Sequence, residues 1–85
     1  MPKSVFTDAY DTFLSMLVDA RKDAGITQVD LAKKLNRPQP FVSYFERGER
    51  RIDIIEFFVI ARHLGIEPLQ FLAKLEKRLP QRIDI

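Results

Sequence analysis

Apolar residues recur at spacings of three and four along most of this chain, and each such stretch is followed by a glycine, an asparagine or a proline. This spacing is typical of helices that turn one face to a core, and those residues commonly follow the end of a helix. The pattern predicts five helices and no strands, over about residues 7 or 8 to 24, 28–35, 39–47, 53–64 and 68–79. The expected fold class is all-α.

Residues at the predicted helix ends fit this division. Thr27 and Asp53 precede the second and fourth helices, where their side chains can accept a first-turn N–H. Asn36 follows the second helix, and asparagine tolerates a left-handed turn better than any residue except glycine. Pro38 and Pro40 fall where the first N–H groups of a helix have no partner, so neither breaks the third helix.

The segment 27–51 contains two short helices joined by a tight turn, and Gly48 ends the second of them. Ala32 supplies the small side chain that two steeply crossing helices need where their backbones approach. On the second of these helices, apolar residues alternate with polar ones, so one face suits a core and the other suits a polar partner. This is the construction of a helix-turn-helix, whose second helix lies in the DNA major groove.

The same segment resembles the Cro and phage-repressor type of helix-turn-helix, also called the xenobiotic-response-element family. The motif TQ-x-x-LA followed by S-x-x-E-R-G, with a matching helix on each side, carries the resemblance over about residues 14–74. It implies a compact five-helix domain of the lambda-repressor-like fold that binds DNA. We expect residues 1–85 to form one such domain, with an N-terminal extension (1–9) and a C-terminal tail (80–85). The matching positions are Arg21, Gly25, Thr27, Gln28, Leu31, Ala32, Leu35, Val42, Ser43, Glu46, Arg47, Gly48, Ala61, Leu64, Gly65, Ile66, Leu69 and Leu72.

The start of the third helix is where members of this family read base edges. Gln39 can pair with adenine through two hydrogen bonds, whereas Pro40 has no polar group and offers only packing on a thymine methyl. Phe41 is either an apolar base contact or a residue packed against the first helix. An alternative for Gln39 is that it caps its own helix. The base-reading candidates are therefore Gln39, Pro40, Phe41, Ser43 and Tyr44.

Phosphate contacts are expected on both sides of this helix. The resemblance implies that Gln28 holds a phosphate at the start of the second helix, where N–H groups favour anions; the alternative is a merely exposed polar residue. Arg47, Arg50 and Arg51 follow the third helix. From residue 33 to 51 the net charge is +4, although the whole chain carries only +2. A basic segment of this kind suits a phosphate backbone, unless it is simply a solvated loop.

The resemblance also implies a salt bridge between Arg21 and Glu46, which would tie the first helix to the third. A bidentate bond of this kind orients the reading helix and does no chemistry itself.

The fourth helix carries more apolar residues than one core-facing stripe requires. Its expected stripe is Ile54, Phe57, Phe58 and Ala61. A neighbouring apolar face indicates either a homodimer interface or a thicker core under the N-terminal extension. The interface candidates, with two residues of the fifth helix, are Ile52, Ile55, Val59, Phe71 and Leu75.

Composition argues against the other classes of function. The chain has no cysteine and one histidine, so we expect no metal site and no cofactor. No nucleophile has a base nearby and no glycine-rich phosphate loop occurs, so an enzyme is not expected. No apolar run reaches the roughly 20 residues of a membrane helix, and a cytoplasmic protein is the expectation. The preferred function is a transcriptional regulator that binds a palindromic operator in double-stranded DNA as a homodimer. The alternative is a protein-docking module, such as an antitoxin or coactivator with a partner protein.

Overall fold

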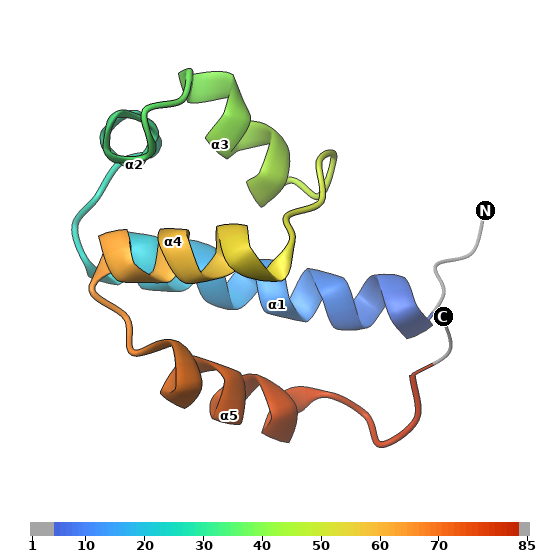
Figure 1. Cartoon of the computed structure of the whole chain (residues 1–85). Coiled ribbons are helices and arrows are strands. Elements are labelled where there is room, and N and C mark those ends of the chain that lie inside the picture. Colours follow the sequence, from blue (N-terminus) through green and yellow to red (C-terminus); the bar gives the residue numbers. More distant parts are fainter. Residues whose placement is uncertain (1–4, 84–85) are drawn as a thin grey trace.

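The computed structural model describes the backbone of residues 5–83 and the side chains from residue 8 onward. Five helices follow one another along the chain, and no strand occurs within the described range (Figure 1). The all-α fold class is therefore confirmed. Residues 1–4 of the expected N-terminal extension and 84–85 of the tail lie outside the described part. The helices are α1 Val5–Asp23, α2 Gln28–Leu35, α3 Gln39–Glu46, α4 Ile54–Leu64 and α5 Pro68–Arg78.

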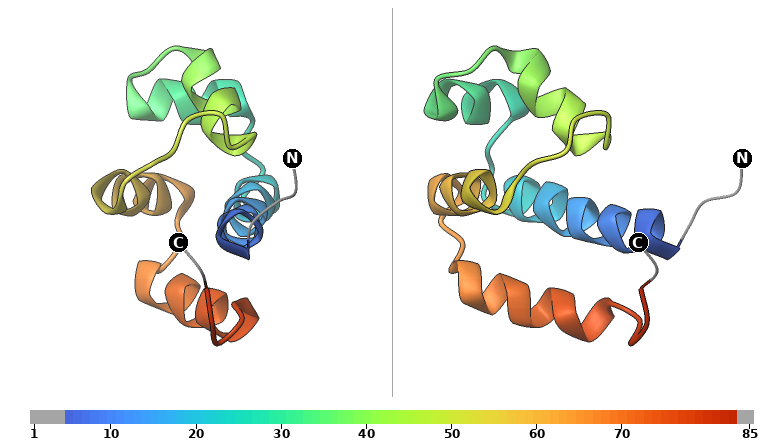
Figure 2. Two further views of the ribbon diagram at one scale, coloured as in Figure 1. Left: turned by 90° about the vertical axis from the view of Figure 1, so that its right-hand side faces the viewer. Right: turned by 45° about the vertical axis from the view of Figure 1, so that its right-hand side comes forward.

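The helices form three levels. In all three views α1 and α4 occupy the middle level, with α2 and α3 on one side and α5 on the other, and the left view of Figure 2 shows α1 and α4 side by side (Figures 1 and 2). The loop between α3 and α4 returns the chain from the outer level to the middle one. As a result, α3 is supported from beneath by α1 and keeps its opposite face free.

The helix ends are held by the side chains that the sequence indicated. At α2, the Thr27 hydroxyl accepts the Asp30 N–H at 3.0 Å and the Asp30 carboxylate accepts the Thr27 N–H at 3.3 Å. Asp53 and Glu56 make the same reciprocal pair at α4, at 2.7 and 2.9 Å. Asn36 ends α2 in the left-handed conformation, with φ of 56°. These reciprocal caps satisfy N–H groups that the helix itself leaves unpaired.

The core lies where the three levels meet. Its largest fully buried side chains come from four of the helices: Leu17, Leu31, Val42, Phe45, Phe57 and Ile60. Phe13, Phe57 and Phe71 form an aromatic cluster with ring centroids 5.2 to 6.0 Å apart, which joins α1, α4 and α5. Ala32 is only 2% exposed, as expected for the small residue at a close helix crossing.

The expected core stripe of α4 is wrong at its first position. Ile54 is 57% exposed, and the buried stripe consists of Phe57, Ile60, Ala61 and Leu64. Ile52, just before the helix, packs on the core instead, and its N–H donates to the Tyr10 hydroxyl at 3.1 Å. The loop therefore supplies the apolar side chain at this end of the core, and the first two residues of α4 face solvent.

We predict that Asp53→Ala lowers the free energy of unfolding by about 1 kcal/mol, because the first-turn N–H groups of α4 lose their acceptor. Thermal and urea unfolding measure the loss. Asp53→Asn is the matched control, since asparagine keeps an acceptor oxygen and caps helices about equally well. Equal destabilisation by both substitutions would show that the charge, and not the cap, is what α4 requires.

Candidate nucleic-acid interface

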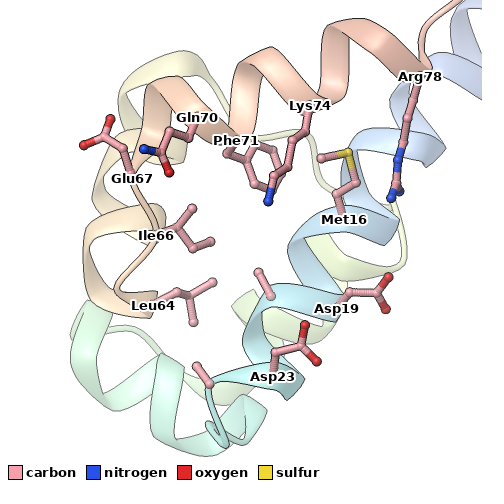
Figure 3. Close-up of a pocket in the computed structure, with 12 residues that line it drawn as sticks. Met16, Asp19, Asp23, Leu64, Ile66, Glu67, Gln70, Phe71, Lys74 and Arg78 are labelled. Atoms are coloured by element: carbon pink, nitrogen blue, oxygen red, sulfur yellow. The ribbon is translucent and has the colours of Figure 1, made fainter.

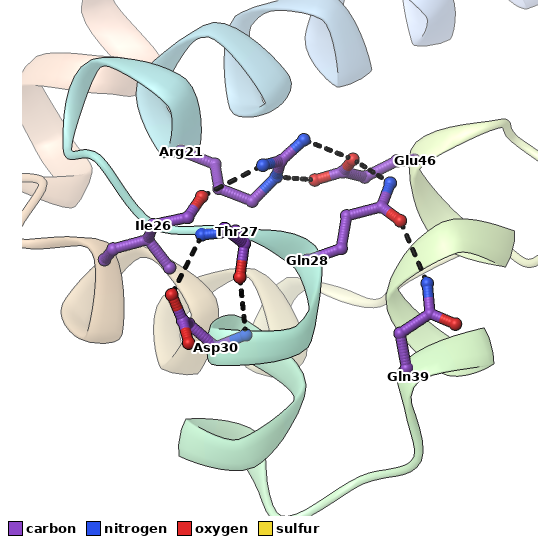
Figure 4. Close-up of polar contacts among 7 residues, drawn as sticks. All are labelled: Arg21, Ile26, Thr27, Gln28, Asp30, Gln39 and Glu46. Carbon is purple, nitrogen blue, oxygen red and sulfur yellow. Dashed lines mark hydrogen bonds and ion pairs between the residues drawn. The ribbon is translucent and has the colours of Figure 1, made fainter.

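The first residues of α2 and α3 lie next to each other at the outer edge of the molecule (Figure 4). Gln28 opens α2 and Gln39 opens α3. Their side-chain amides meet, with Gln39 Nε2 donating to Gln28 Oε1 at 3.0 Å. Two residues that the sequence analysis assigned separately, one to a phosphate and one to a base, therefore form a single polar unit.

This amide pair continues into a buried ion pair. Gln28 Nε2 donates to Glu46 Oε1 at 2.8 Å. The Arg21 guanidinium donates from Nε to Glu46 Oε2 at 2.6 Å and from Nη2 to Oε1 at 3.1 Å. Its remaining Nη1 donates to the Ile26 carbonyl at 2.9 Å. The expected bidentate salt bridge is present in the structure, and the Arg21 and Glu46 side chains are only 10% and 6% exposed.

The four side chains form one network across three helices (Figure 4). It runs from Arg21 on α1 through Glu46 at the end of α3 to Gln28 on α2, and returns to Gln39 at the start of α3. Its buried end ties the helices together, while Gln39 at the other end is exposed. An arrangement of this kind restricts the orientation of an exposed amide without using up all of its hydrogen-bonding capacity.

The bond to Gln28 bears on the alternative role of Gln39. The N-cap of α3 is Pro38, and this helix has no side-chain cap. Gln39 directs its amide to Gln28 and not to its own helix, so the capping alternative finds no support. A primary amide has two donors and a carbonyl acceptor. Gln39 therefore keeps one N–H and its Oε1, which are the two groups that pair with adenine.

The other base-reading candidates have different surroundings. Ser43 Oγ donates to the Pro40 carbonyl at 3.2 Å, so this hydroxyl is held within its own helix. Pro40 is exposed in the first turn of α3. Tyr44 is 46% exposed, with the Arg47 guanidinium 5.3 Å from its ring centroid. Ser43, Pro40 and Tyr44 thus remain at the surface of α3.

Phe41 is the exception among these candidates. Its ring lies 5.7 Å from Phe45 and is packed beside the core. The guanidinium groups of Arg37 and Arg50 lie 5.4 and 4.6 Å from its centroid. This environment favours the packing alternative over direct base contact. Phe41 also borders a hollow that is lined by Leu35 of α2 and by Ile55, Val59 and Ile60 of α4.

The three arginines after α3 are also placed by specific contacts. Arg47 Nε donates to Glu49 at 2.8 Å. Arg50 holds Glu56 through two bonds of 3.0 and 3.2 Å. The Arg51 guanidinium lies 4.7 Å from the Tyr10 ring centroid. Stacking on aromatic rings is a favourable and specific arrangement for arginine.

Two residues at this edge were missed by the sequence analysis. Arg37, in the turn between α2 and α3, stacks on Phe41. Tyr10 of α1 supports the loop between α3 and α4, because its hydroxyl accepts the Ile52 N–H and its ring stacks with Arg51. The helical period places Tyr10 on the core-facing side of the first helix and gives no sign of this second role. The position of Arg37 inside the basic segment was the only available signal.

The structure divides the expected interface residues into two groups. Ile55 and Val59 are 68% and 42% exposed, as an interface would require. Ile52 and Leu75 are partly buried against the core of the same chain. Phe71 is only 5% exposed, so its assignment to an interface is wrong. Its ring belongs to the aromatic cluster that joins α1, α4 and α5, where it has little surface to offer a second copy.

A groove of about 500 Å³ lies on the other side of the molecule, between α1 and α5 (Figure 3). Asp19 and Asp23 line it from α1, and Lys74 and Arg78 line it from α5. Walls of opposite charge produce no field that attracts a polyanion. The face formed by α2, α3 and the following loop is therefore the candidate for nucleic acid.

Within residues 5–83, no group of three histidine, aspartate or glutamate side chains is placed to hold a metal ion. In the same range, no helix has the length and apolar character needed to cross a membrane.

Comparison with known families agrees with this geometry. A helix-turn-helix family model matches residues 17–72, which is more than half of the chain. The chain belongs to the XRE family of helix-turn-helix proteins. This family consists of DNA-binding transcription regulators and is in general non-enzymatic. Among curated proteins, none matches the chain significantly.

A solved structure supports the same membership. It is an XRE-family like protein from Pseudomonas syringae pv. tomato str. DC3000, with 48% sequence identity and a TM-score of 0.81. The match covers 86% of this chain and 89% of the Pseudomonas chain. The five-helix XRE arrangement is thus shared over nearly the whole length of both proteins.

We predict that Glu46→Ala lowers the free energy of unfolding by about 3–5 kcal/mol, because Arg21 keeps a buried charge without its partner. Urea unfolding measures the loss. The double variant Arg21→Met with Glu46→Leu is the control, since it removes both charges and should recover part of the stability. A double variant no more stable than Glu46→Ala would mean that lost packing, not the unpaired charge, causes the effect.

A second prediction concerns the loss of folding stability at low pH. The hydrogen bonds from Arg50, together with that from the Asp53 N–H, lower the pKa of Glu56 below its ordinary value of 4.5. A group whose pKa is lower in the folded state stabilises the fold above its unfolded pKa, and this contribution is lost as pH falls through the folded pKa. We expect the unfolding free energy of Glu56→Gln to fall less steeply than that of the wild type as the pH is lowered below 4.5, because the variant has no carboxylate at this position to protonate. Parallel curves for the two proteins would contradict the assignment.

Proposed function

We propose that this protein is a sequence-specific transcriptional regulator that binds a palindromic operator as a homodimer, with α3 in the major groove. The observation that carries the proposal is the amide pair of Gln28 and Gln39, anchored on the buried Arg21–Glu46 bridge. It presents a base-reading group and a phosphate-binding group side by side in one oriented unit. XRE-family membership supports DNA as the ligand.

In this proposal the side chains at the front of the two helices have separate tasks. Gln39 reads an adenine with its free N–H and Oε1, and Gln28 holds a phosphate together with the first N–H groups of α2. Tyr44 and Ser43 contact bases or backbone from the next turn of α3, and Pro40 packs on a thymine methyl. Phe41 serves as the support on which Arg37 and Arg50 stack.

Arg47, Arg50 and Arg51 anchor the protein to the phosphates. All three are exposed and follow directly after α3. Contacts to phosphates position a protein on the duplex but carry no direct sequence information. These arginines therefore contribute affinity for DNA of every sequence.

We place the dimer contact at the exposed apolar side chains of α4. Ile55 and Val59 border a small hollow of about 160 Å³ that also involves Leu35, Phe41 and Ile60. A second copy is the natural occupant of such a surface, because a two-fold interface uses the same patch on both subunits. Ile52 supports the patch from within its own core, and Leu75 on α5 does not line the hollow.

We infer no catalytic role for this protein, and we place its action in the cytoplasm, where a bacterial regulator meets DNA. Ser43, a possible nucleophile, is bonded to the Pro40 carbonyl. A pure docking module has no need for an oriented amide pair with arginines around it, which is why DNA binding is preferred. Purified protein that shows no salt-dependent retention on DNA would favour the docking function instead.

We predict that Gln39→Ala weakens binding to the preferred operator by about 1–3 kcal/mol, because one bidentate base contact is lost. The operator is first identified by selecting bound sequences from a random DNA pool. The loss should concentrate at one base pair per half-site, while binding to random DNA and the melting temperature change little. A uniform loss on all sequences with a lower melting temperature would refute base reading by Gln39.

Arg51→Ala is the matched control for that experiment. It should weaken binding to operator and random DNA alike and reduce the salt dependence by about one unit for the lost phosphate contact. If this variant altered the sequence preference, Arg51 would belong to a groove contact and not to the phosphates.

A further inference from the structure

Two of the proposed phosphate-binding arginines are held by glutamates of the same chain. Arg47 Nε donates to Glu49 Oε2 at 2.8 Å, and Arg50 donates to both carboxylate oxygens of Glu56 at 3.0 and 3.2 Å. Both ion pairs lie in or beside the loop between α3 and α4, next to the face proposed for DNA. Negative charge at such a place opposes the approach of a polyanion.

The two glutamates differ in what they do for the fold. Glu56 also accepts the Asp53 N–H as part of the cap of α4, and its side chain is 26% exposed. The Glu49 side chain is 57% exposed and accepts the bond from Arg47; it is the backbone N–H of Glu49 that closes the last turn of α3, by donating to the Tyr44 carbonyl at 2.9 Å. Exposed ion pairs contribute little to folding. A contribution to folding stability therefore explains why a glutamate stands at position 56, but it does not explain the glutamate at position 49.

The carboxylate of Glu49 and a DNA phosphate are chemically alike from the viewpoint of Arg47. Both are oxyanions that accept a charge-assisted hydrogen bond from a guanidinium. The bond from Arg47 also lowers the pKa of Glu49, so this group is fully ionised at neutral pH. A phosphate that approaches Arg47 must displace Glu49 or bind against its charge.

We propose that Glu49 is an internal competitor of DNA phosphates for Arg47, which sets the sequence-independent part of the affinity for DNA. This inference rests on the proposed function. Because the competition concerns only a phosphate contact, it lowers the affinity for operator and random DNA together. The ratio of operator affinity to random-DNA affinity depends on the base-reading side chains and not on Glu49.

The test is Glu49→Gln, which removes the charge and keeps the size of the side chain. Binding to a fluorescently labelled mixed-sequence duplex is followed by anisotropy over a series of salt concentrations. We expect binding to tighten by about 1.5- to 5-fold, corresponding to the release of one exposed ion pair. The salt dependence should steepen by up to about one unit, because Arg47 becomes free for a phosphate.

Glu76→Gln is the matched control, since it changes the net charge equally at an exposed site on α5, away from α3 (Figure 1). Its gain should be clearly smaller. In an Arg47→Ala background, the gain from Glu49→Gln should fall to that of Glu76→Gln, because Arg47, the arginine that Glu49 holds, is then absent. A gain that persists there, or that equals the control in the wild-type background, overturns the competitor role.

The result also separates this inference from the proposed function. Wild-type protein that binds the duplex in a salt-dependent way, with a Glu49→Gln variant that binds no more tightly, overturns the competitor role alone. Wild-type protein without salt-dependent binding to any duplex overturns both.

Discussion

One buried ion pair, between Arg21 and Glu46, fixes the positions of α2 and α3 relative to α1. Arg21 uses Nε and Nη2 on the Glu46 carboxylate and Nη1 on the Ile26 carbonyl, so each of its three guanidinium nitrogens donates a hydrogen bond. These three bonds join α1, the loop before α2 and the last turn of α3. A buried charge pair adds little net stability compared with apolar packing, but it tolerates only one geometry. Its main contribution is therefore the orientation of α3 relative to α1.

The same ion pair also orients the amides of Gln28 and Gln39. Glu46 accepts from Gln28, and Gln28 in turn accepts from Gln39. The network therefore begins at an ion pair whose side chains are at most 10% exposed and ends at Gln39, which is exposed at the start of α3. A side chain at the solvent boundary normally samples several rotamers, and ordering it on binding costs free energy. Here much of that ordering is already present in the unbound protein. The aromatic rings on which Arg50 and Arg51 stack reduce the same cost at the edge proposed to bind phosphates.

The sequence was informative where structure depends on neighbours in the chain. Thr27, Asp53 and Asn36 were recognised as end residues because capping and left-handed turns involve residues only a few positions apart. The motif spacing likewise indicated the helix-turn-helix. The bridge between Arg21 and Glu46 came from family resemblance alone, because no local rule relates residues 25 positions apart.

The errors have a common physical origin. The helix IIEFFVIARHL is apolar around most of its circumference, so its period could not distinguish Ile54 from the core residues. Phe71 was misplaced because the depth of a large side chain depends on what packs opposite it, here Phe13 and Phe57. The contact between Gln28 and Gln39 depends on the crossing angle of two helices. The stacks of arginine on Phe41 and Tyr10 depend on the path of a loop, and neither kind of information is contained in residue spacing.

The bond from the Ile52 N–H to the Tyr10 hydroxyl joins residues 42 positions apart, and it holds the loop that follows the reading helix. Together with the Arg21 bridge, it means that the first helix supports both ends of the segment proposed to face DNA. A peptide cut to residues 27–51 would contain every proposed DNA contact but none of these supports. The helix-turn-helix is therefore short in sequence, but it depends on α1 to hold its structure. Grafting it into another protein would require the transfer of its first helix as well.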